Sequence, residues 1–439
     1  MLKDIFPLSL IISLRFLGLF IVLPVLSIYA LELEGSNEFL VGVVIGGYAL
    51  TQMIFQVPFG MLSDKIGRKK TIFIGLVIFA IGSIICAISD NIYMLLLGRF
   101  LQGAGAIGAV VSAMISDFVP EETRAKAMAI MGGSIAGAFA IAMFAGPLIG
   151  GYYGVDKLFI LTTILVFISI LVLLFKVPNP PKVIYTFSEN NSKLKDILKD
   201  VNLIKMNITN FLQKGLMSLT FLIIPIFLTK EFGWEKSELF KVYLPALILG
   251  VIAMAPSAIL AEKKGKYREV LIAGIIFFLI SFLIIGFSHN EILFVIGITL
   301  FFIGFNVHEP IMQSLTSKLA KAHQRGSALG VFNSFGYFGT FIGGMIGASY
   351  IKYGDLTILS YSIVIISIGW IILIAKMENP SKRKNLYIDL KDISKDKISD
   401  LNVVEGVIEH YINESENRVI IKYNEDIIEE KEIKEFFNG

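Results

Sequence analysis

The chain consists largely of long apolar runs separated by short polar stretches. A helix that crosses the hydrocarbon core of a membrane needs about 20 mostly apolar residues, and runs of that length recur along the sequence. The runs show no alternation of polar and apolar positions, which favours helices over a β-barrel, because backbone groups in lipid need internal partners. The predicted spans are residues 8–30, 39–62, 71–89, 92–116, 125–152, 157–176, 207–229, 238–261, 269–288, 291–318, 325–351 and 357–376.

The twelve spans form two groups of six. We therefore predict an all-α polytopic membrane protein with an N-terminal six-helix bundle (1–176) and a C-terminal six-helix bundle (207–379). The polar stretch 177–206 between them is interpreted as a linker with an amphipathic surface helix in SENNSKLKDILKD.

An internal repeat relates the two groups. The segment PFGMLSDKIGRKK (58–70) aligns with PSAILAEKKGKYR (256–268), and both follow the second span of their group. Such parallel repeats occur in transporters whose substrate site lies between the two halves near the membrane midplane. The sequence therefore predicts two pseudo-symmetric bundles around a central site.

The composition changes after KMENPSKRK. Residues 385–439 contain a strand at LYIDL, a helix at KDISKDKISDLN, two alternating strands joined at Glu416–Asn417, and an amphipathic helix at EEKEIKEFF. This β-α-β-β-α order predicts a small ferredoxin-like α+β domain that lacks its last strand. A domain of this size is marginal alone, so docking to the bundle or self-association would stabilise it. This domain acts either as a module for stability or oligomerisation, or as a regulatory sensor.

Composition and charge exclude several functions. The 439 residues are 55% hydrophobic and 17% charged, with a net charge of +3 and a single cysteine, Cys86. One cysteine forms neither an internal disulfide nor a thiolate metal site. There is no phosphate-binding loop, metal-ligand cluster or nucleophile elbow, so we expect no enzyme, no cofactor and no metal. Nucleic-acid binding is also not expected, because the basic residues lie in membrane loops.

The basic residues predict the orientation. The segments after even-numbered spans carry DKIGRKK, EETRAK, KLKDILKD, EKKGKYRE, KLAKAHQR and KRK, whereas those after spans 1, 3, 7 and 9 carry ELEGSNE, SDN, KEFGWEKSE and SHNE. Cytoplasmic loops carry an excess of Lys and Arg. We therefore expect a multi-pass protein of the cytoplasmic (inner) membrane with both termini in the cytoplasm.

The charged stretch GMLSDKIGRKK (60–70) is more than a topogenic loop. It contains an acid flanked by glycines, which allow close helix approach and a tight turn. Asp64 is placed to meet the positive end of another helix, and Arg68 to reach Asp117. This pattern predicts a conformational latch made of Gly60, Asp64, Lys65, Gly67, Arg68 and Asp117.

These residues resemble the loop 2–3 signature of the major facilitator superfamily. LGRFLQGAGAIGA (97–109) is similar to the fourth-span motif of this family. AGPLIGG (145–151), with Gly146, Pro147, Gly150 and Gly151, resembles the fifth-span motif of its drug/proton antiporter branch. SLRFLGLFIVLPVLSIYA, GFNVHEP and the small C-terminal domain resemble the YajR-type members. The resemblance implies two bundles that rock around a central cavity and a substrate exported in exchange for protons.

Four charges stand out inside the predicted spans: Arg15, Arg99, Lys214 and Glu309. A charge in a span is costly and marks function, and spans 1, 4, 7 and 10 line the cavity in this family. Glu309 is the candidate proton carrier, with neighbouring His308 and motif residue Arg99 assigned to proton coupling. Alternatively, Glu309 is a permanently ionised structural partner of Arg15 or Lys214. Three cations against one acid favour an anionic or neutral substrate.

Uncharged polar residues in the spans are candidate substrate contacts. They are Gln52, Gln56, Asn306, Asn333 and Tyr337, each with an alternative role in helix packing. The predicted function is a proton-coupled efflux antiporter for a small molecule. The expected partners are that substrate, protons and the lipid bilayer, and the transporter core is expected to be monomeric. The alternatives are a proton-coupled symporter that imports, and a membrane sensor that binds without transporting.

Overall fold

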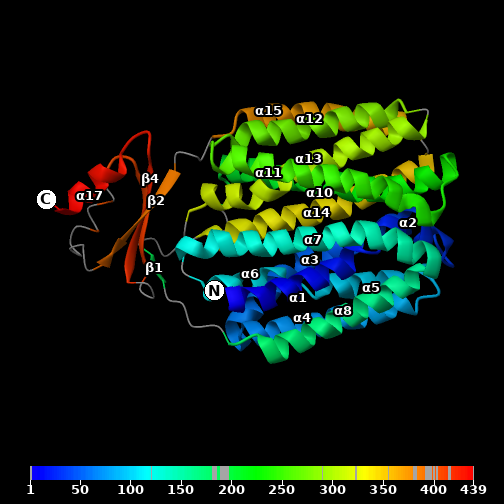
Figure 1. Ribbon diagram of the computed structural model, residues 1–439, viewed down its shortest axis with the longest axis horizontal. Helices are drawn as coiled ribbons and strands as arrows, with labels where there is room; N and C mark the ends of the chain where they lie inside the picture. The colour runs from blue at the N-terminus through cyan, green and yellow to red at the C-terminus, as the bar shows by residue number, and fades with distance from the viewer. Residues whose placement is uncertain are drawn as a thin grey trace.

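The computed structural model describes residues 2–119, 121–179, 185–187, 197–288, 290–321, 324–353, 355–378, 383–390, 398, 401, 404–413 and 417–438. Within them, twelve helical segments are long and apolar enough to cross a membrane. Figure 1 shows these helices packed side by side, with a small sheet at one end of the bundle. The predicted all-α polytopic fold with a small α+β tail is confirmed.

The first six spans are built from eight helices: α1 (Leu2–Phe20), α2 (Leu23–Glu32), α3 (Glu38–Ile66), α4 (Arg68–Ala87), α5 (Ile92–Ala104), α6 (Gly108–Asp117), α7 (Glu121–Tyr153) and α8 (Val155–Lys176). The last six are built from α10 (Val201–Glu231), the 3-10 helix η1 (Lys236–Leu239), α11 (Phe240–Glu262), α12 (Tyr267–Gly286), α13 (Glu291–Leu319), α14 (Arg325–Tyr353) and α15 (Leu356–Ala375). The helix α10 begins at Val201, earlier than predicted, because the Asp200 side chain caps it.

Two spans predicted as continuous helices are interrupted. Span 1 breaks at Ile21–Val22 between α1 and α2, where Pro24 has no N–H to donate to the carbonyl of Phe20. Span 4 breaks at Gly105–Ile107 between α5 and α6. A Cβ on Gly105 would overlap the carbonyl oxygen of Gly75 on α4, so the glycine permits this close approach.

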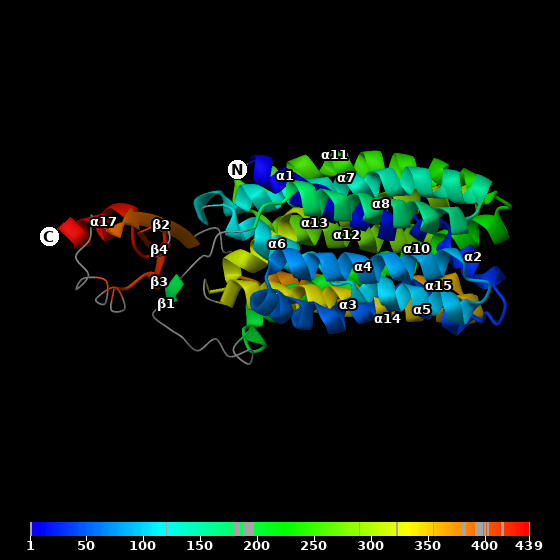
Figure 2. The same ribbon diagram turned by 90° about the horizontal axis from the view of Figure 1, so that it is seen from below.

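The two halves contact each other at one end of the bundle. We call the end that carries the sheet and the N-terminus the proximal end, and the opposite end the distal end (Figure 2). At the distal end Lys236 forms an ion pair with Glu32 of the other half at 2.7 Å. A Cβ on Gly42 of α3 would lie 2.7 Å from the carbonyl oxygen of Gly344 on α14. The halves are therefore closely packed at the distal end.

The proximal end differs in its packing. Cβ atoms added at Gly60 on α3, Gly132 and Gly133 on α7, and Gly326 and Gly330 on α14 would meet nothing within 4 Å. Helices from both halves thus have open space beside them at this end. The halves are thus in contact distally, whereas these proximal positions border open space, the arrangement expected of a bundle that is closed distally and open proximally.

The tail sheet contains a strand from the linker. Its strands are β1 (Tyr185–Phe187), β2 (Arg383–Asp389), β3 (Val407–Asn413) and β4 (Arg418–Asn424), followed by α17 (Glu430–Asn438). The order β1-β3-β4-β2 is antiparallel throughout. The third tail strand lies between the other two, as in split ferredoxin-like folds. The linker strand β1 was not predicted, and the amphipathic helix expected in residues 188–200 lies mostly outside the described residues.

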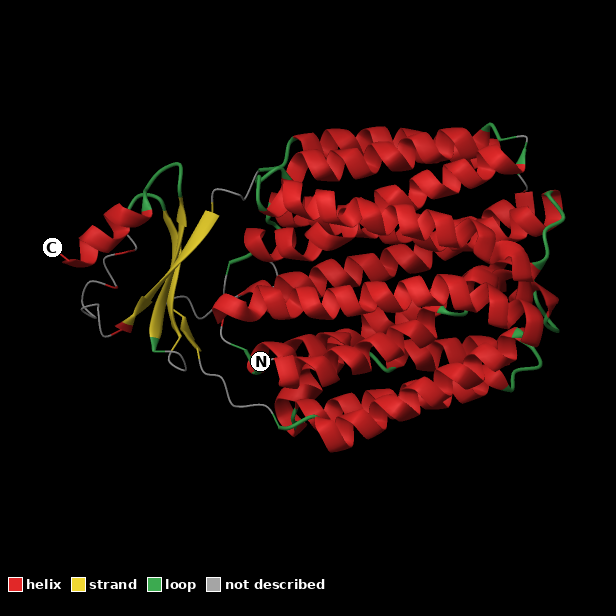
Figure 3. Cartoon of the chain, in the orientation of Figure 1, coloured by secondary structure: helices red, strands yellow, loops and turns green. Residues whose placement is uncertain are grey.

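The sheet separates α17 from the bundle, as Figure 3 shows. One sheet face carries the tail core, which includes Leu386, Val419 and Ile421 and is closed by Ile433 of α17. The predicted turn holds Asn417 at a positive φ of 52°, a conformation that asparagine tolerates better than most residues. The helix predicted at KDISKDKISDLN lies outside the described residues apart from Ile398 and Leu401.

Candidate functional site

Arg15 is fully buried in the first half. Its Nη2 donates to Gln52 Oε1 of α3 at 3.3 Å, a long hydrogen bond. The guanidinium carbon lies 5.1 Å from the ring centre of Phe79 and 5.5 Å from that of Phe16. Nε and Nη1 have no hydrogen-bond partner among the residues that the structure describes. Aromatic rings and one amide thus surround this charge.

Arg99 on α5 is also fully buried. Its Nε donates to the carbonyl of Val44 at 3.3 Å and its Nη1 to Gln102 Oε1 at 2.7 Å. The guanidinium carbon lies 4.6 Å from the ring centre of Tyr48. Within the described part of the chain, Nη2 lacks a partner. Sequence reasoning missed Gln102 and Tyr48, although Gln102 follows Arg99 at the i+3 spacing of helix neighbours.

Lys214 and Glu309 form an ion pair between α10 and α13. The Lys214 ammonium lies 2.9 and 3.1 Å from the two carboxylate oxygens, and the side chains are 25% and 40% exposed. Gln213 Nε2 donates to the same carboxylate at 3.4 Å. Of the two partners that the sequence left open for Glu309, the structure places Lys214 beside it. This pair is accessible, unlike the two arginines.

His308 is directed away from this pair. Its Nε2 lies 2.7 Å from the carbonyl oxygen of Leu271 on α12, and its ring packs edge-on against Phe278 and Trp370. Consecutive residues on a helix do not face each other. We therefore correct the expectation that His308 acts beside Glu309, and leave it out of the mechanism below.

The candidate substrate contacts separate into different environments. Gln52 Nε2 donates to Tyr337 Oη at 2.6 Å, so this bond joins α3 of one half to α14 of the other. Gln56 is buried on α3, and Asn333 is partly exposed on α14. Asn306 donates to the carbonyl of Phe302 on its own helix at 2.8 Å, which indicates a packing role for that amide.

The loop 2–3 residues form a linked cluster at the proximal end. Arg68 Nε lies 3.2 Å from Asp117 Oδ2, and its Nη1 lies 2.6 Å from Asp64 Oδ1. Gly67 has a φ of +97°, which favours glycine. The Asp64 side chain is 67% exposed, as expected at the open end, and Lys65 is exposed as well. The cluster joins spans 2, 3 and 4 of one half.

The second half has a counterpart with reversed charges. Glu262, which aligns with Asp64, lies 2.5 Å from Lys318 at the end of α13. Ser314 and Tyr267 donate to the same carboxylate at 2.6 and 2.7 Å. The sequence repeat identified Glu262 and includes Tyr267, whereas Ser314 and Lys318 lie two spans further along the chain and have no matching motif. The ends of the second and fourth spans are thus linked through Arg68 of the third span in the first half, and by a direct ion pair in the second half.

The fifth-span glycines lie where α7 meets other helices. A Cβ on Gly146 would overlap the carbonyl oxygen of Ile21 at the break in span 1. One on Gly150 would lie 3.0 Å from Val25, and one on Gly151 would lie 2.6 Å from the Ser237 backbone of the other half. Pro147 lies within the helix between them. The motif therefore packs α7 against both the broken span and the opposite half.

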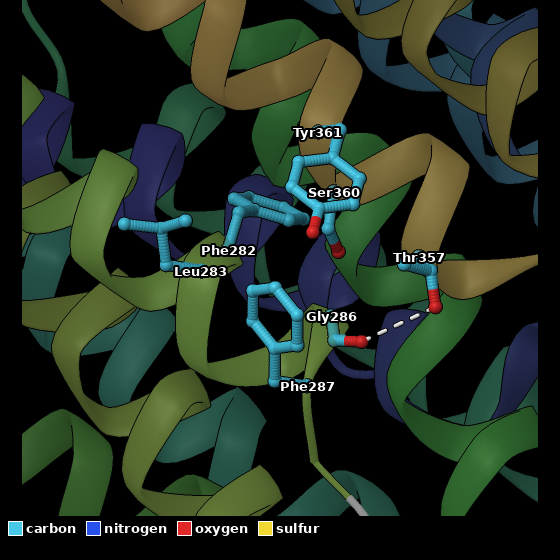
Figure 4. Close-up of a pocket in the computed structure, with 7 residues that line it drawn as sticks. All are labelled: Phe282, Leu283, Gly286, Phe287, Thr357, Ser360 and Tyr361. Carbon is cyan, nitrogen blue, oxygen red and sulfur yellow. Dashed lines mark hydrogen bonds between the residues drawn. The ribbon is translucent and has the colours of Figure 1, made fainter.

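A crevice between α12 and α15 lies apart from these residues. Figure 4 shows its lining, which is mostly apolar and includes a hydrogen bond from Thr357 Oγ1 to the carbonyl of Gly286 at 3.3 Å. None of the candidate residues lines it, so we assign it no role in transport.

A twelve-span bundle in two pseudo-symmetric halves, with charges between its helices, defines a membrane transporter. The model of the Major Facilitator Superfamily matches residues 8–344 and 209–392, and the chain belongs to this family. It is 34% identical over 431 residues to the inner membrane transport protein YajR of Escherichia coli K12, covering 97% of this chain and 95% of that protein. The family predicted from the sequence motifs is confirmed.

Two further comparisons extend this assignment. The tetracycline resistance protein, class B, of Escherichia coli is 26% identical over 332 residues, covering 72% of this chain and 81% of that protein. The crystal structure of the human organic anion transporter MFSD10 superposes with a TM-score of 0.66 at 14% identity, covering 85% of this chain and 99% of that one. The latter shows the shared fold.

Proposed function

We propose that this transporter exports a small molecule in exchange for protons by alternating access. The observation that carries the proposal is the accessible Lys214–Glu309 ion pair within the spans. A carboxylate can exist charged or neutral, and a neighbouring cation favours its charged form. Protonation of Glu309 would release Lys214 from the ion pair. A substrate that competes for Lys214 or Glu309 would in turn favour release of the proton from Glu309. The pair thus supplies a means of exchange.

The closed distal end fits the state in which an exporter loads its substrate. The proximal loops carry the excess of Lys and Arg, so the positive-inside rule assigns them, and both termini, to the cytoplasm. The conformation described above is then open to the cytoplasm, where an exporter loads its substrate. The fifth-span motif and the similarity to a tetracycline resistance protein favour export over import. We assign Arg99, bound to a backbone carbonyl, the role of orienting the site.

Alternating access can be tested by locking the distal end. In the variant Glu32→Cys/Lys236→Cys, a reversible bifunctional thiol reagent would join the halves where the native ion pair lies. The native Cys86 is buried, so background reaction is low. In vesicles with an imposed pH gradient, a panel of anionic, neutral and cationic compounds is expected to drive proton movement in the opposite direction. The cross-link is expected to stop it, and reductant to restore it.

Glu32→Cys alone, treated with the same reagent, is the control and should remain active. Flux that persists in the cross-linked protein would contradict alternating access. Protons and substrate moving in the same direction would identify a symporter. Binding of a compound without flux in either direction would indicate a sensor.

A further inference from the structure

The two buried arginines of the first half lack a counter-charge. Arg15 and Arg99 are each 0% exposed, and a guanidinium remains charged in proteins. Neither forms an ion pair with a carboxylate within the described residues. Buried charges are normally paired, and Glu309 already pairs with Lys214. The first half therefore holds two positive charges that the described protein groups do not neutralise.

Three nitrogen atoms of these groups have no hydrogen-bond partner among the described residues, namely Nε and Nη1 of Arg15 and Nη2 of Arg99. Cation–π contacts with Phe79 and Tyr48 offset part of the cost of burial. They leave the hydrogen-bonding capacity of the guanidinium groups unfilled. An anion would supply both the charge and the acceptors that are missing.

A chain of two hydrogen bonds connects Arg15 of the first half to Tyr337 of the second half. Gln52 Oε1 accepts a long 3.3 Å bond from Arg15, and Gln52 Nε2 donates to Tyr337 Oη. Tyr337 on α14 is partly buried as a residue, so this chain connects the second half to the buried guanidinium of the first. The neutral amide oxygen of Gln52 occupies the place that a carboxylate would fill with a shorter, stronger bond.

We propose that Arg15 is the anchor of a binding site for an organic anion, whose carboxylate or comparable group displaces Gln52 Oε1 and also contacts Tyr337. This inference rests on the proposed transport function and names its substrate class. Because Gln52–Tyr337 is a contact between the halves, an anion that replaces it would bind both halves at once. Binding and the relative position of the halves are thereby linked.

The test measures binding rather than transport. Purified protein in detergent is titrated with an aliphatic, a monocyclic and a bicyclic probe, each as carboxylate, carboxamide and primary ammonium, and its unfolding temperature is followed. A ligand that binds the native state raises that temperature. We expect stabilisation by carboxylates and not by their amide or ammonium counterparts. For Arg15→Gln, the half-saturating concentration should rise about tenfold or more, as for loss of a charged hydrogen bond.

Arg15→Lys should retain part of the binding, and the exposed-site variant Lys157→Gln should bind as the native protein does. The proposal is overturned if no carboxylate stabilises, if amides or ammonium compounds stabilise equally well, or if Arg15→Gln binds unchanged. The comparison of carboxylate, carboxamide and ammonium probes on the native protein tests the anion site even if Arg15→Gln does not fold. Since no proton gradient is involved, anion binding without exchange would refute antiport while leaving this site in place.

A separate observation concerns the tail domain, which is bound to two parts of the transporter. Its strand β3 pairs with β1 of the linker, with Tyr185 opposite Asn413 and Phe187 opposite Tyr411. Its Lys422 donates to the carbonyls of Lys318 and Ala320 at 2.8 and 2.7 Å. The tail sheet thus holds both the connection between the halves and the end of α13.

The sheet face away from the tail core is also buried. Ile420 is 0%, Tyr411 3% and Lys422 4% exposed, whereas their neighbours Val419 and Ile421 belong to the tail core. A cation at the C-terminal carbonyls of a helix is stabilised by the helix dipole. This helix, α13, also carries Glu309, so one rigid element joins the ion pair to the tail.

We infer that the tail domain is an intramolecular brace that favours the proximally open conformation. When the proximal ends of the halves approach, the end of α8 must move relative to α13. The sheet pairs with β1, in the segment that follows α8, and also contacts the end of α13, so it opposes displacement of β1 relative to α13. The brace therefore opposes closure until one of these contacts breaks.

The distance between spin labels at Lys70→Cys and Lys264→Cys, both exposed and in opposite halves, reports proximal opening in the full-length protein. We expect mainly long distances in the otherwise native protein. Lys422→Met, which removes a charged hydrogen-bond donor, should raise the short-distance population about tenfold. Thr186→Pro, which disrupts strand pairing, should shift it in the same direction. Lys384→Met, on the same sheet and paired with Glu425, is the control.

Unchanged distances in both test variants, a shift towards longer distances, or an equal shift in Lys384→Met would overturn the brace. The two test variants alter different contacts, so misfolding of one leaves the other informative.

Discussion

Substitution of Glu309 by glutamine is expected to reduce substrate-driven proton movement to the level of protein-free vesicles. Glutamine preserves the shape of the side chain but cannot take up or release a proton. The Lys214 ammonium, 2.9 Å away in the native protein, then remains without its charged partner in every state. Internal pH, followed with a dye in reconstituted vesicles, measures the effect. Glu291→Gln at the opposite end of the same helix is the matched control and should transport normally.

The double variant Glu309→Gln/Lys214→Gln separates proton transfer from structural pairing. If Glu309 only neutralises Lys214, removal of both charges should restore much of the activity, because the damage in the single variant then comes from the charge left without its partner. If Glu309 carries the proton, the double variant should be as inactive in coupled flux as the single one. Restored proton flux in the double variant would contradict our assignment.

The existence and order of the spans follow from local physical chemistry, which explains why the sequence predicted them. Runs of apolar residues long enough to cross a membrane have few alternatives to a helix. The breaks in spans 1 and 4 depend on tertiary contacts as well. Pro24 favours the first, whereas the second places Gly105 against Gly75 of a neighbouring helix, a contact that one span alone does not reveal.

The sequence predicted which charged residues belong to the site better than it predicted which of them contact each other. Arg15, Lys214 and Glu309 are conspicuous because charges are rare in spans. Their partners depend on which helix faces which, so Glu309 had two possible cations before the structure placed Lys214 beside it. The orientation of His308 follows from its position on α13, since consecutive helix residues do not face the same way, and its ring lies against Leu271 of α12.

The linker strand shows the limit of local signals most clearly. Three residues, Tyr185–Phe187, become a strand only because β3 offers an edge that comes from residues more than two hundred positions later. Lys422 likewise reads as a solvent-facing residue of an alternating strand, but it lies buried against the end of α13. Both contacts join the tail to the transporter, and neither leaves a motif in the sequence.

Alanine in place of Gly146 is expected to cost about 1–3 kcal/mol of stability through overpacking and to impair transport strongly. Its Cβ would overlap the carbonyl oxygen of Ile21, where span 1 is already interrupted and where a backbone shift would displace α2. That helix carries Glu32 of the distal ion pair, so the damage reaches the contact between the halves. Thermal unfolding of the purified protein and exchange in vesicles measure the two effects.

Gly137→Ala on the same helix provides the matched comparison. A Cβ there would meet nothing within 4 Å, and alanine favours a helix over glycine by about 1 kcal/mol, so this variant should be at least as stable as the native protein. If the fifth-span motif acts through close packing against the broken span, the two alanines will differ sharply in both assays. Equal behaviour of Gly146→Ala and Gly137→Ala would show that the contact with Ile21 is dispensable, and that the glycines of this helix contribute only general flexibility.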